Sequence, residues 1–284
     1  MKIPDNTLIQ SISLRVRNIE DSVKFYSYLM GFKVIDKKPN QVFLSPNGKL
    51  PYLICLTESG NSKSRNPKSP GLFHAAFKFP SRKELGRVFL RLFNNQIKFQ
   101  GFSDHLVSEA IYLSDPDGNG IELYADKPRS EWEWTFGQVV MDTLPLDLSK
   151  ITSEIDDPEI WNGIHPETNI GHIHLSVSDL YKSEKFYSHI LGFNVSNSLI
   201  PGAVFYSAGG YHHHIGTNIW QSEKGRTYEE KKTGLLEFTI KFPDENYLRS
   251  VTDKITESDL YIKSEGLNEF KVKDSDGIEI RLIV

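Results

Sequence analysis

The chain has 284 residues, of which 38% are hydrophobic and 25% are charged, a balance typical of a globular protein with a full core. Its formal charge is −4 with acids and bases interspersed, so the sequence has no basic stripe for a phosphate backbone, and we expect no nucleic acid partner. It has neither an apolar run of about eighteen residues for a membrane span nor a signal-peptide core at its start. We therefore expect a cytoplasmic protein without membrane contact.

The opening of the chain is repeated in its middle. Residues 9–34, IQSISLRVRNIEDSVKFYSYLMGFKV, match residues 170–195, IGHIHLSVSDLYKSEKFYSHILGFNV, without a gap. Each copy begins with alternating apolar residues, which predict a half-buried strand, and continues with apolar residues at helical spacing. Gly31 and Gly192 then stand where a glycine that ends a helix belongs. The chain thus contains an internal duplication.

A second similarity joins the segments that follow. GLFHAAFKFP at residues 71–80 resembles GLLEFTIKFP at 234–243, and each leads into a helical stretch. Each then ends in strands around an acidic turn, at 110–125 and 270–283. In the first of these helical stretches, the predicted buried face comprises Leu85, Val88, Phe89 and Leu92.

Together these similarities predict four βαβββ units. They lie near residues 7–60, 70–126, 167–222 and 233–284. A polar connection, residues 127–166, contains Trp132, Trp134 and Trp161, which we expect to cover a core or a seam between domains. The predicted fold is α+β, with two cupped half-barrel domains at 7–126 and 167–284, each made of two units around a concave pocket.

The repeats, the GHIHLSVSDL opening and the DPDGNGIEL turn resemble the vicinal oxygen chelate superfamily of glyoxalases, bleomycin resistance proteins and extradiol dioxygenases. The resemblance covers nearly the whole chain apart from the connection. Within the superfamily, the segments SDHLVSEAIYLSDPDGNGIEL and GGYHHHIGTNIW are similar to extradiol dioxygenases of the catechol 2,3-dioxygenase type. The resemblance implies a metal-dependent oxidoreductase of aromatic compound catabolism.

The resemblance also places metal ligands on the first and last strands of paired units. His74 and Glu122 from the second unit, with His172 from the third, would supply two imidazoles and one carboxylate. This set suits Fe(II) with open positions for substrate and O₂. It requires the second and third units to share a half-barrel. In the first unit Ser11 and Ser13 replace the histidines of the third, so that metal position is predicted to be lost.

A second pairing remains open. If the third unit pairs with the fourth, His172 would join Glu237 and Glu279. This carboxylate-rich set resembles that of glyoxalases, which hold Ni²⁺ or Zn²⁺.

The run of three histidines offers a further ligand. On a strand, alternate side chains point to opposite faces, so we expect His212 and His214 on one face and His213 on the other. Alignment with the closing-strand glutamate segment of glyoxalases places His214 at a ligand position, and a shift of one residue selects His213.

The segment from His105 to Glu122 resembles the extradiol signature of histidine, tyrosine, Asp-Pro-x-Gly and glutamate. By this resemblance His105 would be the acid/base that handles a substrate hydroxyl proton, and Tyr112 a hydrogen-bond donor to the bound intermediate. Ser103 departs from the signature, which has glycine, asparagine, threonine or a small aliphatic residue at that position.

The expected function is that of a non-haem Fe(II) extradiol ring-cleaving dioxygenase, with a catechol-like diol and O₂ as its partners. Mn, Ni or Zn are the alternative cations. The alternative functions are a glyoxalase- or epimerase-like lyase or isomerase, and a metal-free protein that binds a small molecule or drug. Sheet edges in such half-barrels also favour a homodimer.

Overall fold

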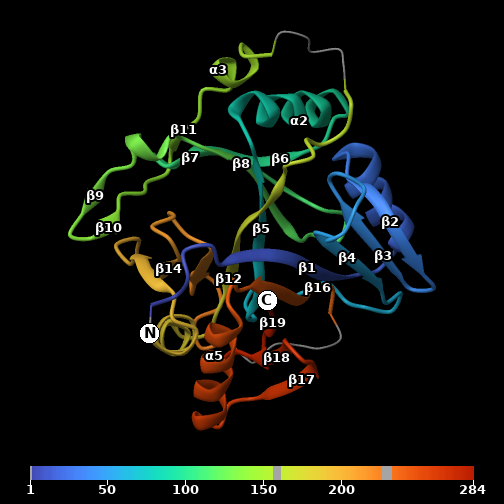
Figure 1. Ribbon diagram of the computed structural model, residues 1–284. Helices are drawn as coiled ribbons and strands as arrows, with labels where there is room; N and C mark the ends of the chain where they lie inside the picture. The colour runs from blue at the N-terminus through green and yellow to red at the C-terminus, as the bar shows by residue number, and fades with distance from the viewer. Residues whose placement is uncertain (1, 156–160, 226–231) are drawn as a thin grey trace.

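The computed structural model describes residues 2–155, 161–225 and 232–284, so positions 156–160 of the expected connection lie outside the described residues. Two large curled sheets meet at the middle of the molecule, where β1 passes beside β12 (Figure 1). The larger sheet has nine strands and the other has eight. The predicted α+β fold with half-barrel sheets is confirmed.

The eight-stranded sheet has the order β17-β18-β19-β16-β1-β4-β3-β2. Its strands are β1 (Leu8–Val16), β2 (Lys33–Lys38), β3 (Gln41–Ser45), β4 (Ile54–Glu58), β16 (Gly234–Lys241), β17 (Ile262–Gly266), β18 (Glu269–Lys273) and β19 (Glu279–Ile283).

The nine-stranded sheet has the order β11-β6-β7-β8-β5-β12-β15-β14-β13. Its strands are β5 (Gly71–Phe79), β6 (Phe99–Asp104), β7 (Ser108–Ser114), β8 (Gly120–Asp126), β11 (Leu144–Pro145), β12 (Asn169–Ser176), β13 (Asn194–Asn197), β14 (Ala203–Ser207) and β15 (Ile215–Asn218).

Each sheet joins units that are far apart in the sequence. The opening strand of a unit pairs in parallel with a later strand of the same unit, as β1 does with β4 and β5 with β8. Its other edge is then open and takes the opening strand of a distant unit: β1 pairs with β16, and β5 with β12, both antiparallel. The first unit therefore shares a sheet with the fourth, and the second with the third.

This strand order decides between the two pairings that the sequence left open. The second and third units share one sheet, and the pairing of the third unit with the fourth is wrong. The two halves of the sequence, 7–126 and 167–284, do not correspond to the two sheets, because each sheet takes one unit from each half. A division into domains at the connection stays a prediction.

The helices of the duplicated segments follow the predicted pattern. α1 (Ile19–Val23) continues into the π-helical segment η1 (Lys24–Leu29), and α4 (Leu180–Glu184) continues into η3 (Lys185–Ile190). Gly31 and Gly192 end these helices with φ values of 89° and 85°, a backbone conformation that glycine adopts without a steric cost. Both predicted glycine positions are confirmed.

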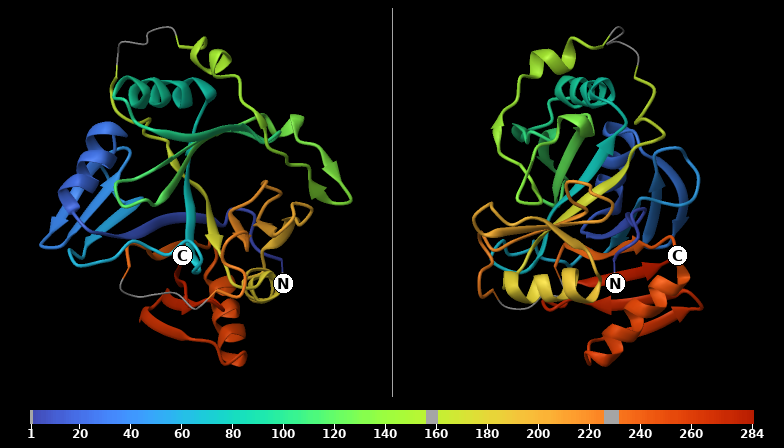
Figure 2. Two further views of the ribbon diagram at one scale, coloured as in Figure 1. Left: turned by 180° about the vertical axis from the view of Figure 1, so that it is seen from behind. Right: turned by 60° about the vertical axis from the view of Figure 1, so that its left-hand side comes forward.

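The other helices cover the outer faces of the sheets. α2 (Arg82–Asn94) contacts β5 and β8, and all four residues of its predicted apolar face are buried, as expected. The short α3 (Leu148–Thr152) packs on α2 (Figure 2), and α5 (Glu245–Glu257) contacts β17. None of the helices in the described part of the chain is long and apolar enough to cross a membrane.

The connection after β8 lies against the second and third units. It contains η2 (Arg129–Glu131) and a hairpin of β9 (Trp134–Thr135) and β10 (Gln138–Val139). Trp132 is buried against Val107, Val139 and Tyr211, and it therefore covers a small core beside the nine-stranded sheet. Trp134 is exposed in the hairpin.

Two tyrosine–aspartate hydrogen bonds tie neighbouring units together. The hydroxyl of Tyr26 donates to Asp115 Oδ2 at 3.1 Å, and that of Tyr187 donates to Asp274 Oδ2 at 2.8 Å. Each tyrosine lies on the helix of one unit and each aspartate in the acidic turn of the next. Because those units belong to different sheets, these buried bonds join the two sheets.

The buried carboxyl of Asp274 should make stability depend on pH. Burial and the nearby Asp276 raise the pKa of Asp274 to about 7. The folded protein then keeps a proton that the unfolded chain releases near pH 4, so the free energy of unfolding falls as pH rises from about 4 to 7. Between pH 4.5 and pH 8, the free energy of unfolding of Asp274→Asn should fall by roughly 2–4 kcal/mol less than that of the wild type, as measured by urea unfolding. Asp253→Asn, at an exposed position on α5, is the control; equal pH slopes in all three proteins would contradict the prediction.

Candidate active site

Three adjacent strands of the nine-stranded sheet present the predicted metal ligands on one face. His74 lies on β5, Glu122 on β8 and His172 on β12, with β5 in the middle. Ala76 of β5 is paired with both Glu122 and His172, and His74 is two residues away from it. Because side chains two residues apart share a face of a sheet, all three groups point the same way.

The three side chains converge closely. Glu122 Oε2 lies 2.9 Å from His74 Nε2 and 3.2 Å from His172 Nε2. One ligand atom from each residue can be chosen so that all three lie within 4.8 Å of one another, and all three residues are buried. The sheet therefore gathers two imidazoles and one carboxylate around a single point.

The charge states of this cluster follow from burial. Burial raises the pKa of Glu122, but the adjacent His172 and His74 outweigh burial and hold the pKa well below its usual value. Burial lowers the pKa of His172 to about 4, although Glu122 opposes this change. At neutral pH we therefore expect an ionised carboxylate beside a neutral imidazole, which are the forms that bind metal ions.

The donor atoms fit a divalent cation. His74 Nε2 is buried and close to the carboxylate, yet it makes no hydrogen bond to any described residue. A buried polar atom without a partner is costly, and a bound cation would remove that cost for both histidines and the carboxylate. Two imidazoles and a carboxylate on one face suit an iron(II) site with open positions.

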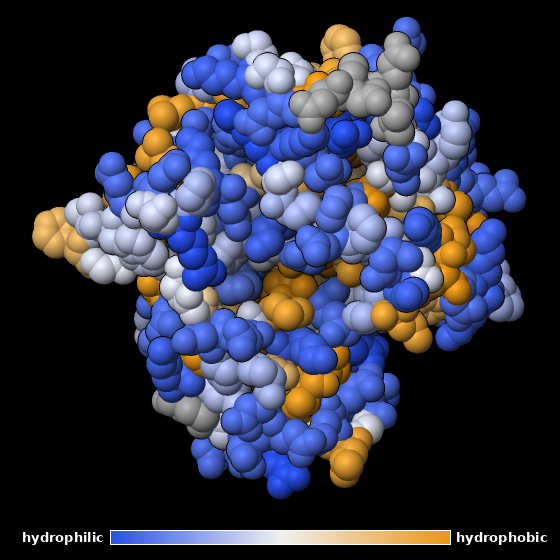
Figure 3. Space-filling model, turned by 45° about the horizontal axis from the view of Figure 1, so that its top comes forward, coloured by the Kyte–Doolittle hydropathy of each residue, from blue (hydrophilic) through white to orange (hydrophobic). Residues whose placement is uncertain are grey.

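A pocket of about 420 Å³ opens over this cluster. Its wall includes all three converging residues, together with His105, Tyr112, His174 and His213. The rest of the lining is largely apolar and includes Phe73, Val107, Ile121, Met141, Phe205 and Trp220. Figure 3 shows one face of the molecule as mostly hydrophilic, with hydrophobic side chains gathered in its hollowed centre. The size and lining of the pocket suit a small aromatic molecule.

His105 and Tyr112 form a hydrogen-bonded pair at the pocket wall. His105 Nε2 lies 2.6 Å from the Tyr112 hydroxyl, and His105 Nδ1 lies 2.7 Å from the carbonyl oxygen of Asp142. The carbonyl can only accept, so Nδ1 carries the proton and Nε2 accepts from the tyrosine. Both ring nitrogens of His105 are thus engaged.

The structure does not bring His214 into the cluster. Its Nδ1 accepts a hydrogen bond from the backbone of Ala208 at 3.2 Å, and burial lowers its pKa to about 3. Among the described residues it belongs to neither group of converging donor atoms. Residues 212–214 precede β15 and are not in a strand, so strict alternation of side chains does not apply to them. His213, rather than His214, reaches the pocket.

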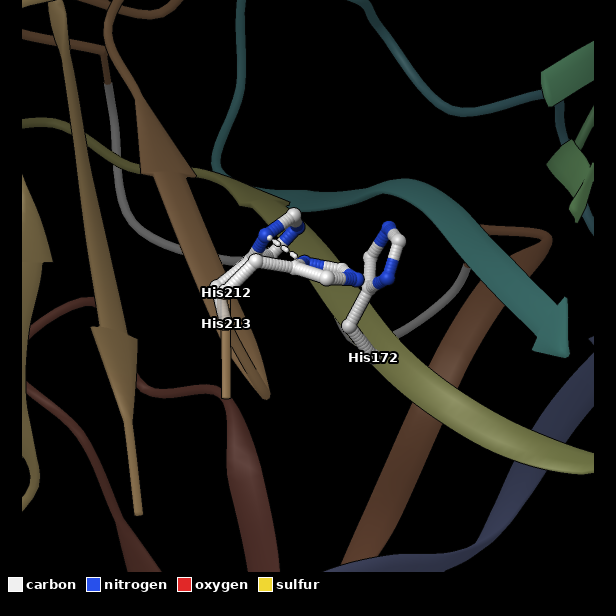
Figure 4. Close-up of side chains that lie close together, drawn as sticks. All are labelled: His172, His212 and His213. Atoms are coloured by element: carbon white, nitrogen blue, oxygen red, sulfur yellow. Dashed lines mark hydrogen bonds between the residues drawn. The ribbon is translucent and has the colours of Figure 1, made fainter. Parts of the chain in front are cut away.

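His213 is held by a chain of hydrogen bonds that the sequence did not predict, and Figure 4 shows its link from His212 to His213. Asp126 Oδ1 lies 3.1 Å from His212 Nε2, and His212 Nδ1 lies 2.8 Å from His213 Nδ1. Asp126 accepts the proton of Nε2, so His212 accepts through Nδ1 and His213 donates through its own Nδ1. The second nitrogen of His213 is left as an acceptor in the pocket wall.

His212, His213 and His172 also have donor atoms within 4.8 Å of one another, and Figure 4 shows their three rings side by side. In this group, however, the nitrogens of His212 are already bonded to Asp126 and His213. It is better described as a hydrogen-bonded chain than as a second ligand set. The only signal for it in the sequence was the run of three histidines.

Tyr124 packs tightly against the back of His172. Their ring centroids are 4.9 Å apart, and a Cβ atom added at Gly171 would lie 1.6 Å from the Tyr124 hydroxyl. We expect Gly171→Ala to lower the free energy of unfolding by about 1–3 kcal/mol, because the tyrosine must move. Urea unfolding of Gly171→Ala and of Gly171→Ala/Tyr124→Phe tests this, since removal of the hydroxyl should restore part of the loss. An unchanged stability in Gly171→Ala would show that the site relaxes freely.

Comparisons with known proteins agree with this fold and site. The model of the Glyoxalase/Bleomycin resistance protein/Dioxygenase superfamily matches residues 8–123 and 169–282. The chain is 42% identical over 275 residues to the Catechol-2,3-dioxygenase of Bacillus subtilis (strain 168), covering 96% of this chain and 95% of that protein. It is 26% identical over 129 residues to Biphenyl-2,3-diol 1,2-dioxygenase 3 of Rhodococcus globerulus, covering 44% and 68%.

Among solved structures, a protein of Bacillus subtilis subsp. subtilis str. 168 described as a candidate dioxygenase superposes with a TM-score of 0.68 at 13% identity, covering 100% of this chain and 86% of that one. Glyoxalase I from Zea mays gives a TM-score of 0.58 at 16% identity, covering 98% and 92%. At these identities the likeness concerns the fold. From the two matched segments and the near full-length relative, we conclude that the chain belongs to the glyoxalase/bleomycin resistance protein/dioxygenase superfamily.

Proposed function

We propose that this protein is an extradiol ring-cleaving dioxygenase that uses Fe(II) and O₂ to open a catechol-like aromatic diol. The observation that carries the proposal is the convergence of His74, Glu122 and His172 beneath a largely apolar pocket. The near full-length relative named as a catechol dioxygenase supports the same activity. His74, Glu122 and His172 would hold the metal, and Mn, Ni or Zn are the alternative ions.

When bound, Fe(II) would supply the redox chemistry and draw electron density from the two vicinal hydroxyls, which lowers their pKa values. The chain itself must then place the ring, take up a hydroxyl proton and keep water away. The apolar wall, with Phe73, Phe205 and Trp220, can pack against an aromatic ring and exclude water.

We propose that proton handling is divided between two histidines in the wall. Burial and the neighbouring histidines lower the pKa of His213 well below its usual value, so its ring is neutral and its second nitrogen can accept a hydrogen bond from a substrate hydroxyl. His105, the residue favoured by the extradiol signature, has both nitrogens engaged and would act through the Tyr112 hydroxyl. To donate a hydrogen bond to an oxygen of the substrate, the Tyr112 hydroxyl would have to turn its single proton away from His105 Nε2.

The reaction is tested on anaerobically purified, iron-loaded protein. With catechol and O₂ we expect one O₂ consumed for each ring opened, and a product whose mass exceeds that of catechol by two oxygen atoms. Retained nickel or zinc with no oxygen uptake would instead favour the isomerase alternative. If the purified protein binds none of these ions, the alternative of a metal-free protein that binds a small molecule is favoured.

A cytoplasmic location and a homodimer stay predictions from the sequence. Sedimentation of the purified chain would test the dimer, and a single species at the monomer mass of 32.4 kDa would contradict it.

A further inference from the structure

The eight-stranded sheet has its own cavity, of about 550 Å³, formed by the first and fourth units. The fourth unit, red in Figure 2, lies at the end of the molecule opposite α3. Strand pairing allows the two sheets to be compared residue by residue. Ser11 pairs with Thr239 as His172 pairs with Ala76, and Ser13 pairs with Glu237 as His174 pairs with His74. Ser11 therefore takes the place of His172, and Glu237 that of His74.

The third ligand position follows from the acidic turn. Asp115 accepts backbone hydrogen bonds from residues 117 and 119, and Asp274 accepts them from residues 276 and 278. Counted from these turns, Arg281 occupies the position of Glu122. Strand pairing agrees, since Thr239 is opposite Arg281 and Ala76 is opposite Glu122. The two turns have the same length, so Glu279, which the sequence offered as a ligand, corresponds to Gly120: Glu279 is opposite Glu237 as Gly120 is opposite His74.

A guanidinium therefore stands where the other sheet has its carboxylate ligand. Arg281 Nη2 lies 2.8 Å and 3.1 Å from the two oxygens of Glu237. Lys271, which is opposite Arg281 as Tyr112 is opposite Glu122, has its Nζ 2.8 Å from both Glu237 and Glu279. The two carboxylates of the cavity are thus paired with cations, and the arrangement does not suit a metal ion.

The cavity nevertheless remains open and carries a positive excess. Its charged lining comprises four cations and two carboxylates: Arg15, Lys271, Lys273, Arg281, Glu237 and Glu279. Arg281 is also ion-paired with Glu269, and with that carboxylate counted the net formal charge is +1. Lys273 lines the cavity, and no carboxylate is paired with it among the described residues; its Nζ lies 5.3 Å from the ring centroid of Tyr261. Ser13, Gln41 and Thr57 add uncharged hydrogen-bonding groups to the wall.

We propose that this cavity binds a small polar anion, with a carboxylate or phosphate group held near Lys273. Its volume is in the range of small-molecule sites, and a partly enclosed cationic wall favours an anion more than open solvent does. The hydroxyl and amide groups would bind further oxygens of the ligand. The proposal concerns binding alone and holds whether or not the other sheet cleaves catechols.

Calorimetric titration of the full chain tests the proposal, with succinate and inorganic phosphate as the two anions and succinamide as the neutral control. We expect one saturable site for at least one anion, weakened by added salt, and no saturable heat for succinamide. The better-bound anion identifies the group that the cavity selects. Lys273→Gln should weaken binding about tenfold or more, and Lys273→Arg should retain it.

Two further variants locate the site. Lys263→Gln, on β17 of the same sheet but outside the cavity, should bind as the wild type does, as should Glu122→Gln in the other sheet. The proposal is overturned if neither anion binds saturably, if Lys273→Gln binds normally, or if Glu122→Gln changes the affinity in either direction. A weaker affinity in Glu122→Gln would mean an anion held by the metal, and a stronger one an anion relieved of the carboxylate's repulsion. Either change would place the anion in the pocket above His74, and so distinguishes the two cavities.

Discussion

Replacing Glu122 by glutamine should lower the affinity for Fe(II) at least about a hundredfold and abolish ring cleavage. The change keeps the shape of the side chain but removes the charge that His74 and His172 stabilise. Loss of a group that only supports a ligand typically costs tenfold to a hundredfold in metal affinity, and loss of a ligand should cost at least as much. Iron content after anaerobic purification, together with oxygen uptake on catechol, measures both effects.

Glu279→Gln is the matched control, because it makes the same change in the other sheet. Glu279 accepts from Lys271 and lies outside the pocket above His74. We expect this variant to retain its iron and its oxygen uptake. Iron that is lost from Glu279→Gln but kept by Glu122→Gln would refute the metal site proposed above.

Replacing His213 by alanine should lower kcat/KM by about a hundredfold to ten-thousandfold while iron remains bound, since general acid–base groups contribute on that scale. His213 lines the pocket and is held by His212, but it is not one of the three converging ligands. The measurements are kcat/KM for catechol over a range of pH and iron per chain.

His105→Phe separates the two proton-handling histidines. This change removes the acceptor for the Tyr112 hydroxyl and keeps a ring in the wall. If His213 takes the proton, His105→Phe should cost less in kcat/KM than His213→Ala. A larger loss in His105→Phe, with normal activity in His213→Ala, would return the acid/base role to His105. Loss of iron in His213→Ala would instead make His213 a ligand.

The repeat pattern predicted much of the fold because strands and helices within a unit are specified by residues close together in the sequence. Alternating apolar residues and helical spacing specify strands and helices within a unit, and Gly31 and Gly192 mark helix ends through their own backbone preference. Which units share a sheet depends on edges that meet only after each unit has formed. No residue spacing within one unit carries that information, so the sequence left two pairings open.

The candidate site was predicted unevenly for a related reason. His74, Glu122 and His172 lie on regular strands, where position in the sequence fixes the face of the side chain. His213 and His214 precede a strand, and their directions depend on hydrogen bonds to His212 and to the backbone of Ala208. Likewise, the acidic turns of the second and fourth units have the same length, so Arg281 rather than Glu279 is opposite Thr239 as Glu122 is opposite Ala76.

The crossed pairing of units has a consequence for how the proposed metal site would form. His74 and Glu122 are synthesised well before His172, and the three proposed ligands come together only after β12 has paired with β5. A nascent chain that ends before β12 has two of the three donors and an open strand edge. A complete metal site would therefore form only when both halves of the chain have folded together. A bound ion would stabilise this folded chain but not a partly synthesised one.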